Sequence, residues 1–356
     1  MNSYFICATQ TSNMGDLIIN KMLIDELCCY GKVYVDAYGI PEDFKSVLLR
    51  NPNTIDVPQK YRCTAKRFSL LNIIKLFRLI RKQNIVQLTQ SPGPLSKYPF
   101  RLRWGFEFLY LFFKINGVII RFYGNCCSAV AINNIPLDHM CVDKYFLRSY
   151  VSIKYAQKYY GGKCFYIPDL AFLLYYHVNE NKRCCEKSNI VAFNVRMGQN
   201  ERLLITKCVE YIAYLVAQGY KVVLFHQVSS DYRVSELLYK YCSMPNVLLH
   251  KERIWYDDID FYANKKFVVS NRLHSLLTGA AYGAIPIGLI EKNALQSKID
   301  DVFHSANFPE KNLISLDESV DRLNLNDLYF NVGRIFQRNA ELCRRTIKQS
   351  MEEFRH

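Results

Sequence analysis

The sequence lacks the short motifs by which several large enzyme classes are recognised. It contains no G-x-x-x-x-G-K-[ST] phosphate loop, no G-x-G-x-x-G dinucleotide fingerprint, no H-E-x-x-H zinc motif and no G-x-S-x-G nucleophile elbow. Kinases, ordinary dehydrogenases, zinc proteases and serine hydrolases are therefore excluded. The sequence also has no internal repeats and no low-complexity segment, and because half of its residues are apolar it is not a disordered chain.

The cysteines lack the C-x2-C spacing of zinc sites, although 13 are present. Several occur as adjacent pairs, at 28–29, 126–127 and 184–185. The residues that follow Met1 enter a predicted strand at once and are too few for the apolar region of a signal peptide. We therefore expect a cytoplasmic protein with reduced, mostly buried thiols and no metal site.

Acidic residues are almost absent from the stretch between Val57 and Leu137. Thirteen Lys or Arg residues face a single acid there, Glu107, so this stretch carries 13 − 1 = +12 of the net charge of +14 and the rest carries 14 − 12 = +2. Segment 60–83 reads as a basic amphipathic helix, and segment 100–114 adds aromatic residues next to arginines. Such helices suit an anionic membrane surface, and we predict contact through residues 60–121.

An ordinary helix with a solvated basic face is the alternative interpretation of this stretch. The apolar run 104–120 does not predict a membrane span, because Glu107 and Lys114 interrupt it and it is short. No nucleic-acid-binding motif accompanies the charge, so nucleic acid is not an expected partner.

Strand and helix patterns alternate along the chain, which predicts an α/β protein with parallel sheets. We expect two Rossmann-like domains facing a cleft, at 1–178 and 189–324, joined by the polar segment 177–189, with a C-terminal helix at 325–356 packing back on the body. Predicted strands cover 3–9, 32–39, 84–90, 117–124, 143–149, 163–172, 189–195, 221–226, 246–250 and 265–271. Predicted helices cover 17–31, 68–82, 101–114, 151–159, 201–218 and 232–243.

Ligands of parallel α/β sheets bind at the carboxyl ends of the strands, where the first amides of the following helix are free. This rule selects six loops, at 9–16, 90–94, 123–128, 195–198, 226–231 and 270–275. Arg196, His226, Arg272 and His274 all lie in these loops. Arg272 and His274 are predicted in the first turn of a helix, where a cation opposes the helix dipole unless an anion is bound.

Structural roles are open for several of these residues. Arg196 could form a salt bridge between domains, and His226 could be a structural histidine at the end of a strand. Asn13, Gly15 and Asp16 could form no more than a helix cap, with Asn13 at the start, Gly15 in a tight turn and Asp16 near the positive end of the dipole. Together, two arginines, one or two histidines, a helix N-terminus and an acid suit a small, doubly charged anion and proton transfer beside it.

Four segments resemble the polysaccharide pyruvyl transferase family. TSNMGDLIINKMLIDEL (11–27) resembles its N-x-G-D-x-L-I signature, and SNRLHSLLTGAAYGAIPIGL (270–289) resembles its S-x-R-L-H…A-x-x-x-G-x-P signature. The segments LRSYVSIKYAQKYYGGKCFYIPDLAF (147–172) and VAFNVR (191–196) resemble two further blocks. The order and spacing of the four blocks match over most of the chain.

The resemblance implies a glycosyltransferase-B-like fold and transfer of a pyruvyl group from phosphoenolpyruvate to a pair of sugar hydroxyls, giving a cyclic ketal. No cofactor is implied beyond this co-substrate. Arg196 and Arg272 match positions at the phosphoenolpyruvate site, and Ser270 and His226 are assigned with them to the donor side. His274 matches the same site and is our candidate general acid.

On the acceptor side we assign Asn13 and Gly15 to the loop and Asp16 to accepting a hydroxyl proton. The expected acceptor is an oligosaccharide, with a polyprenyl-diphosphate-linked form as one candidate, used at the inner face of the plasma membrane. The chain departs from the family in segment 90–94, QSPGP, where relatives have a glycine-rich loop, and at Arg148-Ser149, where they often read Arg-Asp. A sugar-nucleotide-dependent glycosyltransferase of the same fold and a non-catalytic membrane scaffold are the alternatives.

Overall fold

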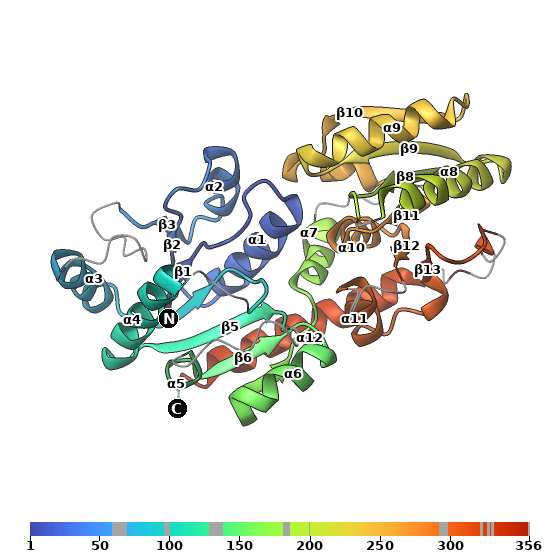
Figure 1. Cartoon of the computed structure of the whole chain (residues 1–356). Helices are drawn as coiled ribbons and strands as arrows, with labels where there is room; N and C mark the ends of the chain where they lie inside the picture. The colour runs from blue at the N-terminus through green and yellow to red at the C-terminus, as the bar shows by residue number, and fades with distance from the viewer. Residues whose placement is uncertain are drawn as a thin grey trace. The chain divides into compact units, whose positions relative to one another are not determined.

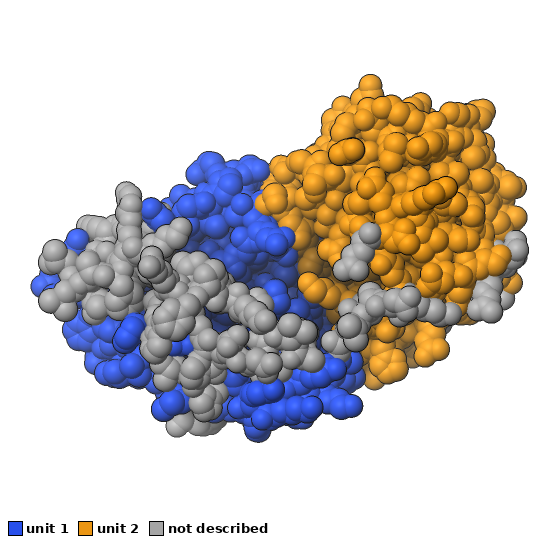
Figure 2. Space-filling view, viewed as in Figure 1, with its two compact units in different colours: residues 1–11, 16–170, 342–356 blue, residues 12–15, 171–341 orange. Residues whose placement is uncertain are grey.

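The structure is a computed structural model that describes residues 1–58, 70–95, 100–127, 138–180, 186–198, 200–291, 298–320, 323–325, 328 and 331–354. The chain forms two compact units (Figures 1 and 2). Unit 1 comprises residues 1–11, 16–170 and 342–356, and unit 2 comprises residues 12–15 and 171–341. The predicted membrane-contact stretch lies outside the described residues at 59–69 and 96–99.

Unit 1 contains a seven-stranded sheet in the order β3-β2-β1-β4-β5-β6-β7, and all of its strand pairs are parallel. Its strands are β1 (Asn2–Ile6), β2 (Val33–Asp36), β3 (Thr54–Asp56), β4 (Ile85–Gln90), β5 (Ile119–Asn125), β6 (Lys144–Leu147) and β7 (Cys164–Tyr166). Its helices are α1 (Met14–Cys28), α2 (Glu42–Leu48), α3 (Leu70–Lys82), α4 (Phe100–Ile115), α5 (Asp138–Cys141) and α6 (Tyr150–Tyr160).

Unit 2 contains a six-stranded parallel sheet in the order β10-β9-β8-β11-β12-β13. Its strands are β8 (Ile190–Asn194), β9 (Lys221–His226), β10 (Val247–Arg253), β11 (Phe267–Ser270), β12 (Ile285–Ile290) and β13 (Leu313–Ser315). Its helices are α7 (Leu174–Glu180), α8 (Glu201–Ala217), α9 (Tyr232–Cys242), α10 (Leu273–Ala281) and α11 (Lys298–Ser305).

Both sheets have the strand order of doubly wound folds, which confirms the predicted α/β class. The central strands are apolar and buried along their length, as in β11, because helices cover both faces of such a sheet. In unit 2 the strand order reverses between β8 and β11, whose neighbours lie in opposite directions. Ligands of this fold class bind at the carboxyl ends of the strands at such a point.

The division of the chain differs from the predicted boundaries. The units separate between Leu170 and Ala171 rather than within 178–189, and residues 12–15 belong to unit 2. The C-terminal helix α12 (Val332–Glu352) passes from unit 2 to unit 1 at Leu342. Its first half packs in unit 2, where the Phe336 ring lies 4.7 Å from that of Phe172. A continuous helical pattern cannot reveal such a division, because both halves have the same local periodicity.

Several elements were absent from the prediction. The elements α2, β3, α7, β12, α11 and β13 are short, and all six have eight residues or fewer. The strand β12 includes Pro286. Proline donates no hydrogen bond to the strand ladder, so its presence argues against predicting a strand. The ten cysteines that the structure describes are all free thiols and eight of them are buried. Among the described residues, no helix combines the length and the apolar character needed to cross a bilayer.

The Arg148-Ser149 departure from the family pattern has a simple local explanation. Ser149 is the N-cap of α6, and its side chain accepts a hydrogen bond from the Ser152 amide at 3.1 Å. Serine and aspartate are equally good N-caps, so a family aspartate at this position would make the same contact. In the other departing segment, Ser91 Oγ accepts a hydrogen bond from the Ala8 amide at 2.9 Å, which ties the loop after β4 to the end of β1.

Arg148 and Asp169 form an ion pair inside unit 1, at 3.0 Å, with side chains only 7% and 1% exposed. We expect Arg148→Met to lower the free energy of unfolding by about 3–5 kcal/mol, because it leaves a buried carboxylate without its cation. The double variant Arg148→Met/Asp169→Asn should recover much of that loss. Urea unfolding of the two variants measures the difference, and an equal loss in both would contradict a role for the charge pair.

Candidate functional site

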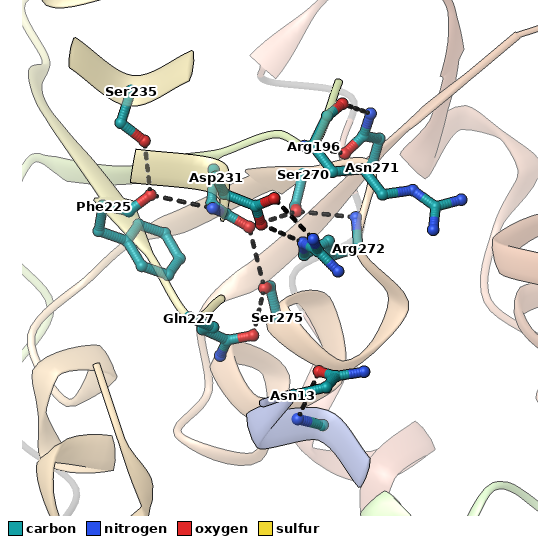
Figure 3. Close-up of polar contacts among 12 residues, drawn as sticks. Asn13, Arg196, Phe225, Gln227, Asp231, Ser235, Ser270, Asn271, Arg272 and Ser275 are labelled. Carbon is teal, nitrogen blue, oxygen red and sulfur yellow. Dashed lines mark hydrogen bonds and ion pairs between the residues drawn. The ribbon is translucent and has the colours of Figure 1, made fainter. Parts of the chain in front are cut away.

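The carboxyl edge of the unit 2 sheet carries a connected set of polar side chains (Figure 3). The last residues of β8 and β11, Asn194 and Ser270, are register partners at this edge. The chain leaves β11, turns at Asn271 and Arg272, and starts α10 at Leu273. The first turn of α10 thus stands at the point where the strand order reverses.

A buried hydrogen-bond network fixes this helix start from below. Ser275 Oγ donates to Gln227 Oε1 at 2.7 Å and lies 3.2 Å from Asn194 Oδ1. Asn194 Nδ2 donates to the Phe225 carbonyl at 2.9 Å, and Gln227 Nε2 donates to the Tyr262 hydroxyl at 2.8 Å. Asn194, Gln227 and Ser275 are each at most 1% exposed. Satisfied polar groups of this kind rigidify a site, because breaking one bond leaves a buried group unpaired.

Arg272 is the N-cap residue of α10 and is paired with Asp231. Its Nη2 donates to Asp231 Oδ1 at 2.6 Å, its Nε donates to Oδ2, and its amide donates to Ser270 Oγ at 2.9 Å. The Asp231 side chain is 3% exposed and that of Arg272 is 17% exposed. We predicted that the cations at this helix start require a bound anion. That prediction is corrected in part, because Asp231 already supplies a negative charge beside Arg272.

Arg272 can still bind a ligand while it is paired with Asp231. A guanidinium has five N–H donors, and the contacts with described residues use two of them, both on one carboxylate. The remaining donors belong to a fork whose orientation Asp231 holds fixed. The N-cap side chain, Arg272, makes no capping hydrogen bond to α10, so the start of this helix suits an anion.

Arg196 follows β8 and is held to the neighbouring loop through its backbone. Its amide donates to Asn271 Oδ1 at 2.8 Å, and Asn271 Nδ2 donates to the Arg196 carbonyl at 2.9 Å. The Arg196 side chain is exposed and makes no ion pair with a described residue of unit 2. The clamp therefore fixes where Arg196 leaves the backbone and leaves its guanidinium accessible.

His274 packs directly against Gly15, which belongs to unit 2. A methyl group at residue 15 would lie 2.2 Å from His274 Nδ1 and 2.6 Å from His274 Cβ, so only glycine fits there. Asn13 precedes α1, and its Oδ1 accepts a hydrogen bond from the Gly15 amide at 3.0 Å. The capping interpretation of Asn13 is thus correct, and Gly15 has the further role of admitting the imidazole.

Two further predicted site residues are His226 and Asp16. His226 ends β9 and is 4% exposed, with its ring 5.0 Å from that of Tyr232. Burial lowers the pKa of His226, so its imidazole is neutral at neutral pH and its donor-binding role stays a prediction. Asp16 belongs to unit 1, where its carbonyl accepts a hydrogen bond from Asn20 Nδ2 at 2.6 Å, and its role as a base also stays a prediction.

Asp231, Asn271, Gln227 and Ser275 were not predicted as site residues. All four lie in the two loops that the strand-end rule had selected, 226–231 and 270–275. Polar side chains in those loops were the available signal, but their pairing depends on the order of strands in the sheet. In the described parts of the chain, no group of three or more His, Cys, Asp or Glu side chains is arranged to hold a metal ion.

No protein-family profile matches this chain, and no curated protein sequence matches it. Several solved structures have a similar fold over nearly all of it. UDP-GlcNAc 2-epimerase from Neisseria meningitidis, solved with UDP-GlcNAc, has a TM-score of 0.62 at 9% identity, covering 99% of this chain and 100% of its own. A glycosyltransferase from Rickettsia africae has a TM-score of 0.55 at 11% identity, covering 99% and 98%.

A third similar structure is MurG from Acinetobacter baumannii, with a TM-score of 0.51 at 9% identity and 99% coverage of both chains. Sequence identities this low establish the fold and nothing finer. The chain has the glycosyltransferase-B fold.

Proposed function

We propose that this protein transfers a pyruvyl group from phosphoenolpyruvate to a pair of hydroxyls on a polysaccharide precursor. The observation that carries the proposal is the packing of His274 on Gly15. Within unit 2 it joins residues 13–15 of the N-x-G-D segment to the S-x-R-L-H segment. Both segments resemble the pyruvyl transferase family and lie far apart in the sequence. The Arg196–Asn271 clamp adds a third such segment to the same edge of the sheet.

The donor chemistry fits the groups at this edge. Phosphoenolpyruvate carries a carboxylate and a phosphate, which suit the remaining donors of Arg272, the side chain of Arg196 and the first amides of α10. Because Asp231 cancels the charge of Arg272, the net attraction for this anion comes from Arg196 and the helix terminus. Arg272 then orients the ligand, because Asp231 holds its guanidinium in position before the ligand binds.

In the proposed reaction His274, in its protonated form, gives a proton to the methylene carbon of phosphoenolpyruvate. This makes C2 an oxocarbenium-like centre, and one sugar hydroxyl forms a C–O bond there and loses its proton. The bond from C2 to the phosphate oxygen then breaks, and phosphate leaves with the electron pair. A second hydroxyl attacks C2, loses its proton and closes the ketal. The proton from His274 ends on the new methyl group, and of the two hydroxyl protons one ends on phosphate and one returns to His274.

The solved structures favour a second candidate, a sugar-nucleotide-dependent transferase or epimerase. The UDP-GlcNAc-bound epimerase and the glycosyltransferase share the fold of the whole chain. In this alternative the start of α10 and Arg196 would hold the diphosphate of a nucleotide sugar. It gives His274 no specific task beside Gly15, which is why we place it second.

Phosphorus NMR of the purified protein with phosphoenolpyruvate and a panel of methyl glycosides tests the proposal. We expect inorganic phosphate to appear with a glycoside whose hydroxyl pair can be bridged, and an equal amount of ketal product to appear by mass spectrometry. Release of UDP from UDP-GlcNAc on the same glycosides, with phosphoenolpyruvate left intact, would favour the second candidate.

A further inference from the structure

Two helices of unit 1 pack on neighbouring strands of its sheet, α3 against β4 and α4 against β5. Both contribute to one hydrophobic core, α3 through Leu76, Leu79 and Ile80, and α4 mainly through Tyr110 and Phe113. The two helices therefore have their inner faces filled by the sheet. Apolar residues elsewhere on them are not required for that packing.

The outer faces of these helices are apolar as well. The exposed side chains are Ile74 (43%), Phe77 (40%), Phe108 (53%), Leu111 (42%) and Ile115 (75%), which we call the α3–α4 face. They make up five of the eight exposed Ile, Leu, Met and Phe side chains among the described residues. Their spacing, of three or four residues, forms one outward stripe on each helix. Such a concentration marks an interaction surface.

Exposed cations border this face. Arg78, Arg81 and Lys82 are exposed on α3, and the Arg81 guanidinium lies 5.5 Å from the centre of the Phe77 ring. The one acid of the basic stretch, Glu107, is buried at 3% exposure and does not oppose an external anion. Arg121, by contrast, is buried on Ser350 and Glu353, so it does not belong to this surface.

We propose that the α3–α4 face docks on an anionic phospholipid surface. Apolar side chains at its centre suit the acyl boundary of a bilayer, and the neighbouring cations suit acidic headgroups. A second copy of this chain is a poorer occupant, because self-association would bring two basic stretches together. This inference stands independently of the chemistry at α10, since no residue of the face belongs to unit 2.

Co-sedimentation of the full chain with vesicles of equal parts phosphatidylglycerol and phosphatidylcholine tests the inference. We expect binding that weakens with added salt and is absent on phosphatidylcholine alone. Arg78→Ala/Arg81→Ala/Lys82→Ala should bind roughly a hundredfold more weakly, since each cation near the surface contributes about a factor of five. Phe77→Ser/Leu111→Ser should also bind weakly, which separates insertion from simple charge attraction.

The matched control is Arg334→Ala/Arg338→Ala/Arg345→Ala, which removes three exposed cations from α12. We expect it to bind vesicles like the unchanged protein, and all variants to keep their activity on water-soluble substrates. Equal loss of binding in the control and the α3 variant would overturn the proposal, because vesicle binding would then depend on net charge and not on the α3–α4 face. Wild-type protein that ignores anionic vesicles, or that dimerises through Phe77 and Leu111, would overturn it outright.

Discussion

The His274→Ala variant is expected to lose pyruvyl transfer by about a hundredfold to ten-thousandfold, the usual contribution of a positioned general acid. Because Arg196, Arg272 and the first amides of α10 hold the donor in our proposal, the variant should still bind phosphoenolpyruvate. The measurement is turnover by phosphate release, together with the thermal shift produced by the donor.

A surface histidine supplies the matched control for this experiment. His304 is exposed in the last turn of α11, and His304→Ala should leave both turnover and donor binding unchanged. Near-normal turnover in His274→Ala would remove His274 from the reaction. Loss of donor binding with folding intact would instead reassign it from proton donor to anion holder.

The Gly15→Ala variant should be destabilised by about 1–3 kcal/mol and inactive, because the added methyl group overpacks against His274. Removing the histidine side chain removes the clash. When His274→Gly is already present, we therefore expect Gly15→Ala to lower the free energy of unfolding by about 0.5–3 kcal/mol less. Double-mutant cycles find couplings of this size between residues in contact. Denaturant unfolding of the four proteins gives this coupling directly.

Gly333 provides the matched control for Gly15. Gly15 is the second residue of α1 and Gly333 is the second residue of α12, but a methyl group at Gly333 meets nothing within 4 Å. Gly333→Ala should therefore stabilise the protein by about 0.4–1 kcal/mol. Additive effects of Gly15→Ala and His274→Gly would show that the two residues do not touch.

The buried parallel sheets were the most predictable part of the molecule. Strands such as β9 and β11 are short apolar runs between turn residues, and their burial follows from that pattern alone. The division of α12 between two units could not be predicted in the same way. It depends on tertiary contacts that each unit makes separately. In unit 2 Phe336 packs on Phe172, and in unit 1 Ser350 is bonded by Arg121.

The loops that form the candidate site could be predicted from the sequence, but the contacts between their side chains could not. The strand-end rule selected the segments of Arg196, Arg272 and His274, and the structure places all three at the edge of one sheet. The partner of Arg272 was missed, because an acid 41 residues away in sequence gives no local signal of pairing. The same holds for Gly15, whose requirement for glycine follows from a distant side chain rather than from its own turn.

The central claim, that the start of α10 binds phosphoenolpyruvate, is tested most directly by a thermal shift. Purified protein is heated with phosphoenolpyruvate, UDP-GlcNAc or inorganic phosphate, each tried on the unchanged chain and on Arg196→Ala. A ligand at about 100 times its dissociation constant stabilises the folded state by roughly 2.7 kcal/mol. We predict a shift with phosphoenolpyruvate that exceeds the shift with phosphate and is lost in Arg196→Ala. A shift with UDP-GlcNAc alone would contradict the account.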